Sequence, residues 1–242
     1  MDVKEERILA GEATRHWYYK SKFNALLDIL KPFALTDILD VGAGSGVFSK
    51  MMIQAGKCEH ATCLDPAYPC DRVEQYHGHS IRFVRSIDRV NQSLVLMMDV
   101  LEHVDDDVSL VRQYIESMPS GSKVLVTVPA FDFLWSGHDV FLGHRRRYTL
   151  FSIENCLQTA GLSILRSRFF FGALFPAVFC MRLVNRWQSK HGTLDARSAL
   201  RQYPPPINRA LTYIHDCERV LLFPFNRLAG LTIFCLAEKR KI

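Results

Sequence analysis

The chain has 242 residues, a length that suits one large domain or a domain with an elaboration. Hydrophobic residues make up 48% and charged residues 23%, the composition of a folded globular protein, so a disordered chain is excluded. The charged N-terminus lacks the apolar segment of a secretory signal. Seven cysteines, an odd number without a Cys-x-x-Cys pair, indicate reduced thiols rather than a disulfide framework or a zinc site. Together these features predict a cytoplasmic protein.

The formal net charge of +5 comes from one late segment. Between Arg182 and His215 there are six arginines and lysines and one acid, Asp195, so the rest of the chain balances to zero. The six cations are Arg182, Arg186, Lys190, Arg197, Arg201 and Arg209. Because the basic excess is confined to one segment, it does not indicate a nucleic-acid-binding protein.

Residues 1–36 precede the first predicted strand and are expected to form one or two helices. Trp17, Tyr18, Tyr19 and Phe23 lie close together in this stretch. Two interpretations stay open. The aromatic side chains either cover the mouth of a binding site, where Trp17 and Tyr18 would touch a substrate, or dock the helix on a sheet.

From residue 37 onward, short apolar runs alternate with helical stretches, which predicts an α/β sheet. The predicted strands are Asp37–Val41, His60–Leu64, Arg82–Val84, Ser93–Met98, Lys123–Val128, Leu162–Arg168 and Leu231–Ala237. The predicted helices between them are Val47–Gln54, Asp105–Ser117 and Leu150–Ala160. Glycine-containing turns punctuate these elements.

The first strand runs directly into a glycine-rich turn, Asp40-Val41-Gly42-Ala43-Gly44-Ser45-Gly46. Glycines suit a tight turn that a ligand approaches closely, and the following helix offers free N–H groups. The spacing is one residue short of the NAD-binding fingerprint, which has no counterpart of Asp40. The segment resembles motif I of class I S-adenosylmethionine-dependent methyltransferases, in which this acid faces the methionine amine. The resemblance implies that Asp40, Gly42, Ala43, Gly44 and Gly46 bind S-adenosylmethionine, which leaves as S-adenosylhomocysteine.

Two further strand ends carry candidate cofactor contacts. Asp65-Pro66 follows the second strand about 20 residues after the glycine turn, where a carboxylate can accept hydrogen bonds from both ribose hydroxyls. A helix N-cap is the alternative role for Asp65. After the third strand, Ile87 is expected to pack on the adenine ring, with Ser86 or Asp88 near its amine.

The fourth strand ends in Asp99-Val100-Leu101-Glu102-His103-Val104. This segment resembles the corresponding motif of ubiquinone-biosynthesis O-methyltransferases and their relatives, and Asp99 and Val100 are expected to contact the cofactor. Three roles stay open for the acidic and histidine side chains. His103 is a candidate general base. Asp99, Glu102 and His103 could instead hold a divalent metal, an interpretation that is not favoured, or only cap a helix and position the cofactor.

The densest polar cluster, residues 135–149, follows the fifth strand at the edge where ligands of open α/β sheets bind. It resembles a loop, H-D-x-x-x-G-H-x-R-R-Y-T, of a methyltransferase branch linked to lipid, polyprenyl or glycan pathways. His138 and His144 are therefore candidate catalytic bases. The candidate substrate contacts are Asp139, Arg146, Arg147 and Tyr148, because arginine binds carboxylate or phosphate through two oxygens. Alternatively, part of this run is a solvated face and the start of a helix.

About 60 residues separate the sixth and seventh predicted strands, too many for a structureless loop. They comprise an apolar run from Phe169 to Met181, the basic segment, and a helix-like stretch from Asn208 to Phe223. The apolar run is too short to span a bilayer. We expect either a buried helix or lid over the substrate, or peripheral membrane contact through residues 169–223 beside anionic headgroups.

The resemblance implies a Rossmann-like, seven-stranded, mostly parallel doubly wound sheet whose last strand inserts antiparallel beside the sixth. We divide the chain into an N-terminal helical cover (1–36), a cofactor-binding core (37–168), a helical insert (169–229) and a final strand (230–242). The predicted activity is O-methylation of a small, partly apolar or anionic acceptor, which includes lipid-like molecules. N-methylation, or cofactor binding without catalysis in a membrane-docking protein, is the alternative. The protein is expected in the cytoplasm or at the inner face of the membrane, and its oligomeric state stays open.

Overall fold

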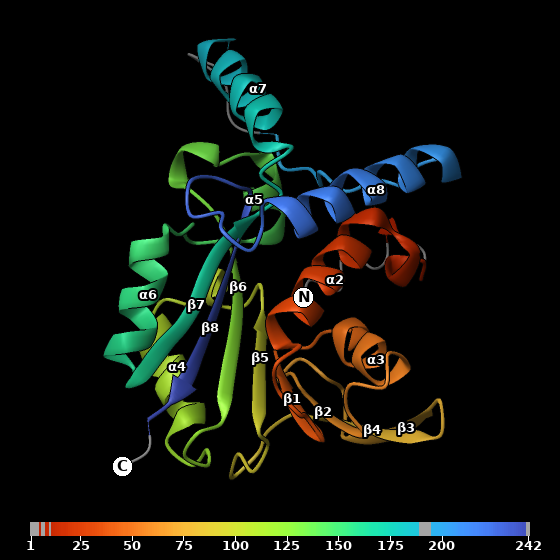
Figure 1. Ribbon diagram of the computed structural model, residues 1–242, viewed down its shortest axis with the longest axis vertical. Helices are drawn as coiled ribbons and strands as arrows, with labels where there is room; N and C mark the ends of the chain where they lie inside the picture. Colours follow the sequence, from red (N-terminus) through yellow and green to blue (C-terminus); the bar gives the residue numbers. More distant parts are fainter. Residues whose placement is uncertain (1–4, 6–7, 10, 189–194, 241–242) are drawn as a thin grey trace.

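In the computed structural model, which describes residues 5, 8, 9, 11–188 and 195–240, the chain folds around one eight-stranded sheet (Figure 1). The strands lie in the order β3-β4-β2-β1-β5-β6-β8-β7. Their bounds are β1 Asp37–Val41, β2 His60–Leu64, β3 Arg72–Tyr76, β4 His79–Val84, β5 Leu94–Met98, β6 Lys123–Pro129, β7 Leu162–Phe170 and β8 Thr232–Lys239.

The central strands are parallel, and the last strand is antiparallel to both of its neighbours. β1 pairs in parallel with β2 and β5, whereas β8 lies antiparallel between β6 and β7. This arrangement confirms the α/β, Rossmann-like sheet expected from the sequence. Because β1 has β2 on one side and β5 on the other, the chain reverses its direction of winding there. A crevice opens at the carboxyl ends of strands at such a point.

The strand β3 is the main departure from the seven predicted strands. It forms an antiparallel hairpin with β4, and the two turn residues have positive φ, +50° at His77 and +80° at Gly78. Such a turn favours Asn-Gly or Asp-Gly, so His-Gly gave no turn signal in the sequence. β4 consequently begins at His79 rather than Arg82.

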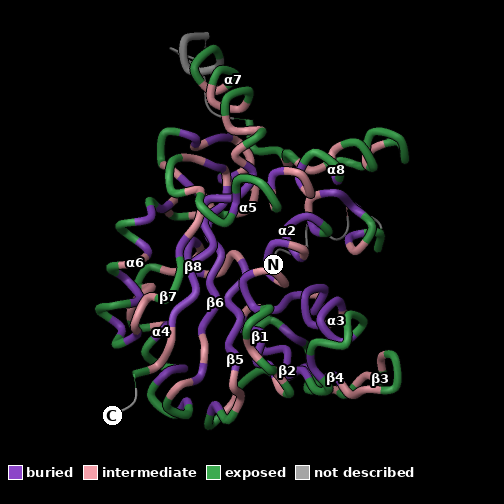
Figure 2. The backbone as a smooth tube through the Cα atoms, in the orientation of Figure 1, coloured by how far each residue is buried: buried purple, intermediate pink, exposed green. Residues whose placement is uncertain are grey.

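Helices cover both faces of the sheet, and the central strands are buried between them, whereas the residues of the edge strand β3 are half-buried or exposed (Figures 1 and 2). Ile38 contributes to a core cluster shared with α2 (Trp17–Leu30) and α3 (Val47–Gln54). Leu39 belongs to a second cluster, shared with α4 (Asp107–Ile115) and α6 (Leu150–Thr159). Successive side chains of a strand point to opposite faces, which explains how adjacent residues enter different clusters.

The insert between β7 and β8 contains two helices, α7 (Phe175–Gln188) and α8 (Pro205–Leu221). The predicted apolar run is divided between two elements, because Phe169 and Phe170 still belong to β7 and are buried with Phe171. The helix begins only at Phe175. In Figure 1, α7 projects from the body of the molecule, where its first turns pack on the short helix η3 (Asp132–Leu134).

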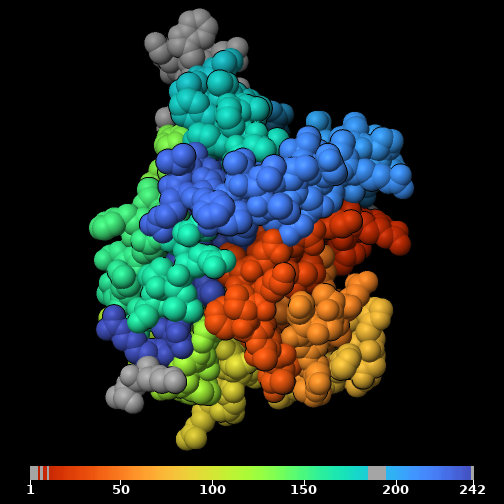
Figure 3. All heavy atoms as spheres, viewed as in Figure 1, coloured from red at the N-terminus to blue at the C-terminus, as the bar shows by residue number. Residues whose placement is uncertain are grey.

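The helix α8 lies across α2, as the space-filling view shows (Figure 3). The side-chain oxygen of Asn208 accepts a hydrogen bond from the backbone N–H of Trp17 at 2.8 Å. Arg219 forms an ion pair with Asp28 at the other end of the contact. Segments about 190 residues apart in sequence are therefore held together as one layer above the carboxyl ends of the strands. Among the described residues, none of the helices combines the length and apolar character required to cross a membrane.

Candidate functional site

The glycine-rich turn lies at the carboxyl end of β1, and two of its glycines, Gly42 and Gly46, have no room for a side chain. Gly42 and Gly46 have φ values of +65° and +70°. A Cβ on Gly42 would lie 2.8 Å from Cγ2 of Val100, and a Cβ on Gly46 would lie 3.0 Å from Cys63 Sγ and the Phe83 ring. Both the backbone conformation and the packing therefore require glycine at these positions.

The carboxylate of Asp65 is tied to the same turn. Its Oδ2 accepts a hydrogen bond from the backbone N–H of Gly44 at 3.1 Å, and its Oδ1 accepts one from Ala67 at 2.9 Å. The Tyr68 hydroxyl donates to the Gly44 carbonyl at 2.7 Å. A carboxylate fixed beside the glycine turn has the geometry expected of a ribose-binding acid, because its oxygens can still accept further hydrogen bonds.

The other residues predicted to bind the cofactor differ in how far they are buried. Asp40 is buried and its Oδ2 accepts a hydrogen bond from the Ser49 hydroxyl at 2.8 Å. Burial raises the pKa of Asp40 to about 6. Ala43 is buried, Ile87 is half-buried, and Pro66 is exposed. Their contacts with a cofactor stay predictions.

A buried lysine that the sequence analysis did not single out faces the end of β5. Lys22, on α2, is fully buried and forms an ion pair with Asp99, while the Tyr18 hydroxyl lies 3.4 Å from its Nζ. Burial alone would raise the pKa of Asp99, but the charge and hydrogen bond of Lys22 hold it below its usual value. Asp99 has φ of +55°, and Thr127 Oγ1 donates to its Oδ1 at 3.1 Å. No periodicity or motif marks a single lysine of an amphipathic helix, so only the fold reveals this contact.

A cavity of about 340 Å³ lies beside this ion pair, beneath α7 and the segment 199–203. Its walls are mainly apolar, with Leu134, Leu174, Val178 and Leu200 among them. It brings together residues predicted from three separate segments of the sequence: Trp17, Tyr18, Asp99, His103, His138, His144 and Arg147. The loop of residues 135–149 and the end of β5 thus line the same cavity.

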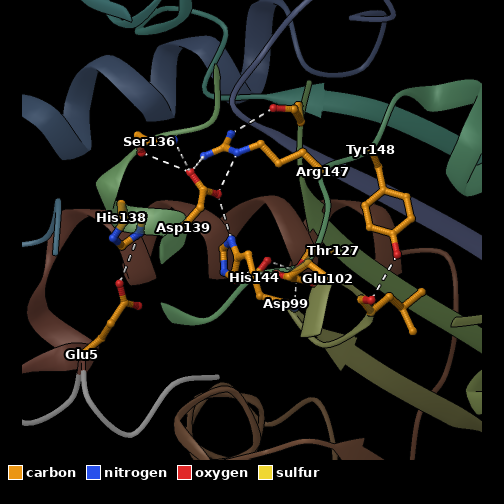
Figure 4. Close-up of polar contacts among 12 residues, drawn as sticks. Glu5, Asp99, Glu102, Thr127, Ser136, His138, Asp139, His144, Arg147 and Tyr148 are labelled. Carbon is orange, nitrogen blue, oxygen red and sulfur yellow. Dashed lines mark hydrogen bonds and ion pairs between the residues drawn. The ribbon is translucent and has the colours of Figure 1, made fainter. Parts of the chain in front are cut away.

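His144 is oriented by a buried carboxylate (Figure 4). Asp139 Oδ1 accepts a hydrogen bond from His144 Nδ1 at 2.9 Å, and the guanidinium of Arg147 binds both oxygens of Asp139 at 2.7 and 3.0 Å. Burial would raise the pKa of Asp139, but these hydrogen bonds lower it well below its usual value. A carboxylate can only accept, so Nδ1 carries the proton and Nε2 keeps its lone pair. This Asp139–His144 pair therefore has the arrangement of a positioned general base.

Glu102 also lines the cavity and is fully buried, with no hydrogen bond to its carboxyl oxygens from the described residues. Its Oε1 is 4.0 Å from His144 Nε2. Burial, together with the negative charge of Asp99, raises the pKa of Glu102 well above its usual value. Glu102, His103 and His144 have donor atoms within 4.8 Å of one another and could share a metal ion. His144 takes the place predicted for Asp99 in this group, because Asp99 is bound to Lys22.

His138 has a different environment from His144. Its Nδ1 accepts a hydrogen bond from the backbone N–H of Ala199 at 3.1 Å, and its Nε2 lies 3.5 Å from Glu5 Oε1. Burial lowers the pKa of His138 to about 4. Both ring nitrogens of His138 are therefore occupied by protein atoms, the backbone N–H of Ala199 and the carboxyl group of Glu5. His138 connects the segment around Ala199 to the cavity wall. Its predicted role as a base gains no support from this geometry.

The remaining predicted substrate contacts bind other parts of the protein. Arg146 donates to the carbonyls of Val104 and Asp105 at 3.1 and 2.6 Å, and the Tyr148 hydroxyl donates to Asp107 at 2.8 Å. Neither residue is among those that line the cavity, and Asp139 lies behind His144 and Arg147. These side chains fix the loop 135–149 onto the turn after β5, and their contact with a substrate stays a prediction.

Comparisons with solved structures show the fold. A phosphoethanolamine N-methyltransferase 2 from Haemonchus contortus, solved with S-adenosylmethionine, is 13% identical, with a TM-score of 0.53 over 91% of this chain and 52% of that one. A SAM-dependent methyltransferase from Archaeoglobus fulgidus is 15% identical, with a TM-score of 0.50 over 92% and 98%. The cyclase SpnF is 14% identical, with a TM-score of 0.52 over 90% and 79%. Since a cyclase shares it, the fold alone does not define the reaction.

The family is shown by the sequence. The model of the methyltransferase domain family matches residues 13–167, more than half of the chain. The chain therefore belongs to the methyltransferase domain family and is a class I, S-adenosylmethionine-dependent methyltransferase. The comparison with curated proteins yields no match for this sequence.

Proposed function

We propose that the protein methylates a hydroxyl oxygen of a small, mainly apolar acceptor that binds in the cavity beneath α7. The observation that carries this proposal is the Asp139–His144 pair, whose Nε2 is positioned to accept a proton at the cavity wall. A hydroxyl is a weak nucleophile until it loses its proton, and a positioned base contributes about 10²–10⁴-fold to such a step. An amine acceptor would not need this pair.

The described residues fit the cofactor that the family implies. Asp65, which accepts a hydrogen bond from the backbone N–H of Gly44 in the glycine turn, can also accept hydrogen bonds from a ribose. Asp99 and Lys22 form an ion pair at the end of the adjoining strand β5. These opposite charges suit the methionine part of the cofactor, which carries both an ammonium and a carboxylate. When bound, S-adenosylmethionine supplies a methyl group activated by its positive sulfur.

The chain's own residues then hold the acceptor and move one proton. His144 Nε2 would take the hydroxyl proton as the acceptor oxygen becomes the nucleophile for the methyl group of S-adenosylmethionine, with the sulfur as the leaving group. Asp139 stabilises the imidazolium that forms, as the carboxylates of Asp-His pairs do. The cavity walls would hold the acceptor oxygen against the methyl group, a positioning effect that can lower the barrier by about 7–11 kcal/mol.

The apolar walls and the resemblance to ubiquinone-biosynthesis O-methyltransferases support a phenolic or other lipid-like acceptor. To test this, the purified protein would be incubated with methyl-labelled S-adenosylmethionine and fractionated cell extract. We expect label in the organic phase, in a product whose mass spectrum places the methyl group on oxygen. Label on nitrogen would instead establish the N-methyltransferase alternative. Binding of S-adenosylhomocysteine without transfer to any fraction would favour a non-catalytic protein.

We further infer that the protein contacts the cytoplasmic face of a membrane with the surface that follows α8. Leu221, Leu222, Phe225 and Leu228 form an apolar set there, with Phe225 81% and Leu228 90% exposed. Arg227 lies within this stretch, and Arg168 donates a hydrogen bond to the carbonyl of Pro224 at 2.7 Å. Burial and the charges of Arg227 and Arg166 lower the pKa of Arg168. Apolar side chains flanked by arginines fit an anionic lipid surface.

Co-sedimentation with vesicles tests this membrane contact. Vesicles of phosphatidylcholine with phosphatidylglycerol should retain the wild type, and the variant Phe225→Ser with Leu228→Ser should stay in solution. Val73→Ser, at an exposed position on the edge strand β3, is the matched control and should bind like the wild type. Equal binding to vesicles of phosphatidylcholine alone would contradict the role of the arginines.

A further inference from the structure

A cation on the wall of the cavity has no partner among the described residues. Arg182, on α7, lines the cavity and is half-buried, and its Nε is buried without a hydrogen bond. None of the ion pairs among the described residues includes it. Burial and the nearby charge of Arg147 lower the pKa of Arg182, so its surroundings oppose the positive charge that it carries.

Several charged side chains of the site are already compensated, while the carboxyl group of Glu5, which also lines the cavity, has His138 Nε2 at 3.5 Å from its Oε1. Arg147 is bound to both oxygens of Asp139, and Lys22 is paired with Asp99. Burial, together with the negative charge of Asp99, raises the pKa of Glu102 and so disfavours a negative charge on that carboxyl. The charge of Asp139 acts on Arg182, but the Asp139 oxygens are bound by Arg147 and His144. Among the described residues Arg182 therefore has no ion-pair partner of its own, in a partly desolvated position where an anion would interact more strongly than in water.

The side chains next to Arg182 on α7 indicate which kind of ligand the cavity would hold. Val178 lies one turn before it on α7, and both side chains line the cavity together with Met181 and Leu174. A guanidinium thus lies at one end of an apolar wall. A planar guanidinium with several donors suits the paired oxygens of a carboxylate or phosphate.

We propose that the acceptor is an amphiphile whose anionic group, a carboxylate or a phosphate, pairs with Arg182 while its apolar part lies along α7. This inference rests on the proposed function and moves the anion-binding role from Arg146 and Arg147, whose donors are bound within the protein, to Arg182. An acceptor of this kind explains why a mainly apolar cavity contains Arg182, a cation without an ion pair among the described residues.

Calorimetric titration of the protein saturated with S-adenosylhomocysteine tests the pairing without any need for turnover. The probes are decyl phosphate, decanoate and decanol, each below its micellar concentration. We expect the wild type to bind at least one of the two anions about 10-fold more tightly than decanol, as a charge-assisted hydrogen bond would give. Whether phosphate or carboxylate binds more tightly distinguishes the two anion classes.

Variants decide whether Arg182 provides this preference. Arg182→Met keeps the length and apolar stem of the side chain and should abolish the preference while leaving decanol binding unchanged. Arg240→Met is the matched control and should keep the preference, because Arg240 binds Ser163 at the end of β8 that lies away from the cavity. An Arg182→Met variant that still prefers the anions would overturn the inference, as would a wild type that binds all three probes equally.

The same titrations separate this inference from the proposed function. Affinity for S-adenosylhomocysteine is measured first for every variant, and Arg182→Met should leave it unchanged. A loss of cofactor affinity in this variant would overturn the inference by placing Arg182 at the cofactor. Anion preference in a protein that never transfers a methyl group would uphold the anion site and contradict only the proposed reaction.

Discussion

Asp139 accepts a hydrogen bond from His144 Nδ1 at 2.9 Å and thereby fixes which ring nitrogen faces the cavity. We expect His144→Gln to lower kcat for a hydroxyl acceptor by about 10²-fold or more, since the base is lost. Asp139→Asn should lower kcat comparably because an amide can donate to Nδ1 and reverse the tautomer. Methyl-transfer kinetics and S-adenosylhomocysteine titrations of both variants provide the measurement. Unchanged kcat in His144→Gln would remove His144 from the reaction.

The group Glu102, His103 and His144 is also suited to a metal ion, which gives a second test. If His144 acts as a base, prior treatment with EDTA should leave methyl transfer unchanged. Added zinc should then inhibit, because a metal would occupy the lone pair of Nε2. Loss of activity with EDTA and recovery with a divalent ion would show instead that His144 is a ligand.

The glycine turn should tolerate no side chain. Gly46→Ala combines a φ of +70° with a Cβ 3.0 Å from Cys63 and Phe83, so it should destabilise the fold by about 1–3 kcal/mol and weaken S-adenosylhomocysteine binding. Gly78→Ala is the matched control, because Gly78 has φ of +80° but nothing within 4 Å of an added Cβ. Chemical denaturation and calorimetric titration should show lost stability in both variants and lost binding only in Gly46→Ala.

Breaking the ion pair between Lys22 and Asp99 should be costly because Lys22 is fully buried. We expect Lys22→Met to lower the free energy of unfolding by about 3 kcal/mol, since an unpaired charge remains near the end of β5. Adding Asp99→Asn should restore part of the loss. Urea denaturation of the two single variants and the double variant measures the coupling, and strictly additive effects would contradict the pairing.

The raised pKa of Glu102 leads us to expect a pH-dependent stability of the folded protein. Its pKa is raised in the folded state, so the folded protein retains a proton that the unfolded chain releases above about pH 4.3. The free energy of unfolding should therefore decline as the pH rises above that value. Glu102→Gln should flatten this decline and raise the melting temperature at pH 8.

Thermal melts at pH 5 and pH 8 measure the effect, with Glu116→Gln, at an exposed position, as the control. A decline that persists unchanged in Glu102→Gln would assign it to other groups. Asp40 is one such group, because burial raises its pKa to about 6.

The sequence predicted those parts of the fold that depend on local pattern. β1 and α3 have the predicted bounds, and Gly42 and Gly46 occupy the strained turn that their spacing indicated. The hairpin strand β3 was missed because its turn lacks a typical turn sequence. The boundary at Phe171, where φ is +60°, was hidden inside a continuous apolar run. Apolar composition does not reveal where a buried strand ends and a helix begins.

Within the site, residue types were easier to predict than their partners. His144 lies in the cavity as expected, but its dependence on Asp139 needs a helix that folds the loop back on itself. Arg146 and Arg147 had the chemistry of anion-binding residues, yet their donors are satisfied by carboxylates and carbonyls brought near by folding. In the sequence, Lys22 and Arg182 cannot be told apart from cations on the surface. Only tertiary packing shows that Lys22 is buried and that Arg182 has no ion pair with any of the described residues.

The roof of the cavity comes from the insert between β7 and β8, whereas the glycine turn and Asp65 belong to the strands beneath it. Changes in α7 or in residues 199–203 can therefore alter which molecule is accepted without disturbing the machinery that holds the methyl donor. Exchange of this insert between related chains offers a route by which new acceptor preferences arise on an unchanged α/β core, and grafting it onto a relative would transfer the preference with it.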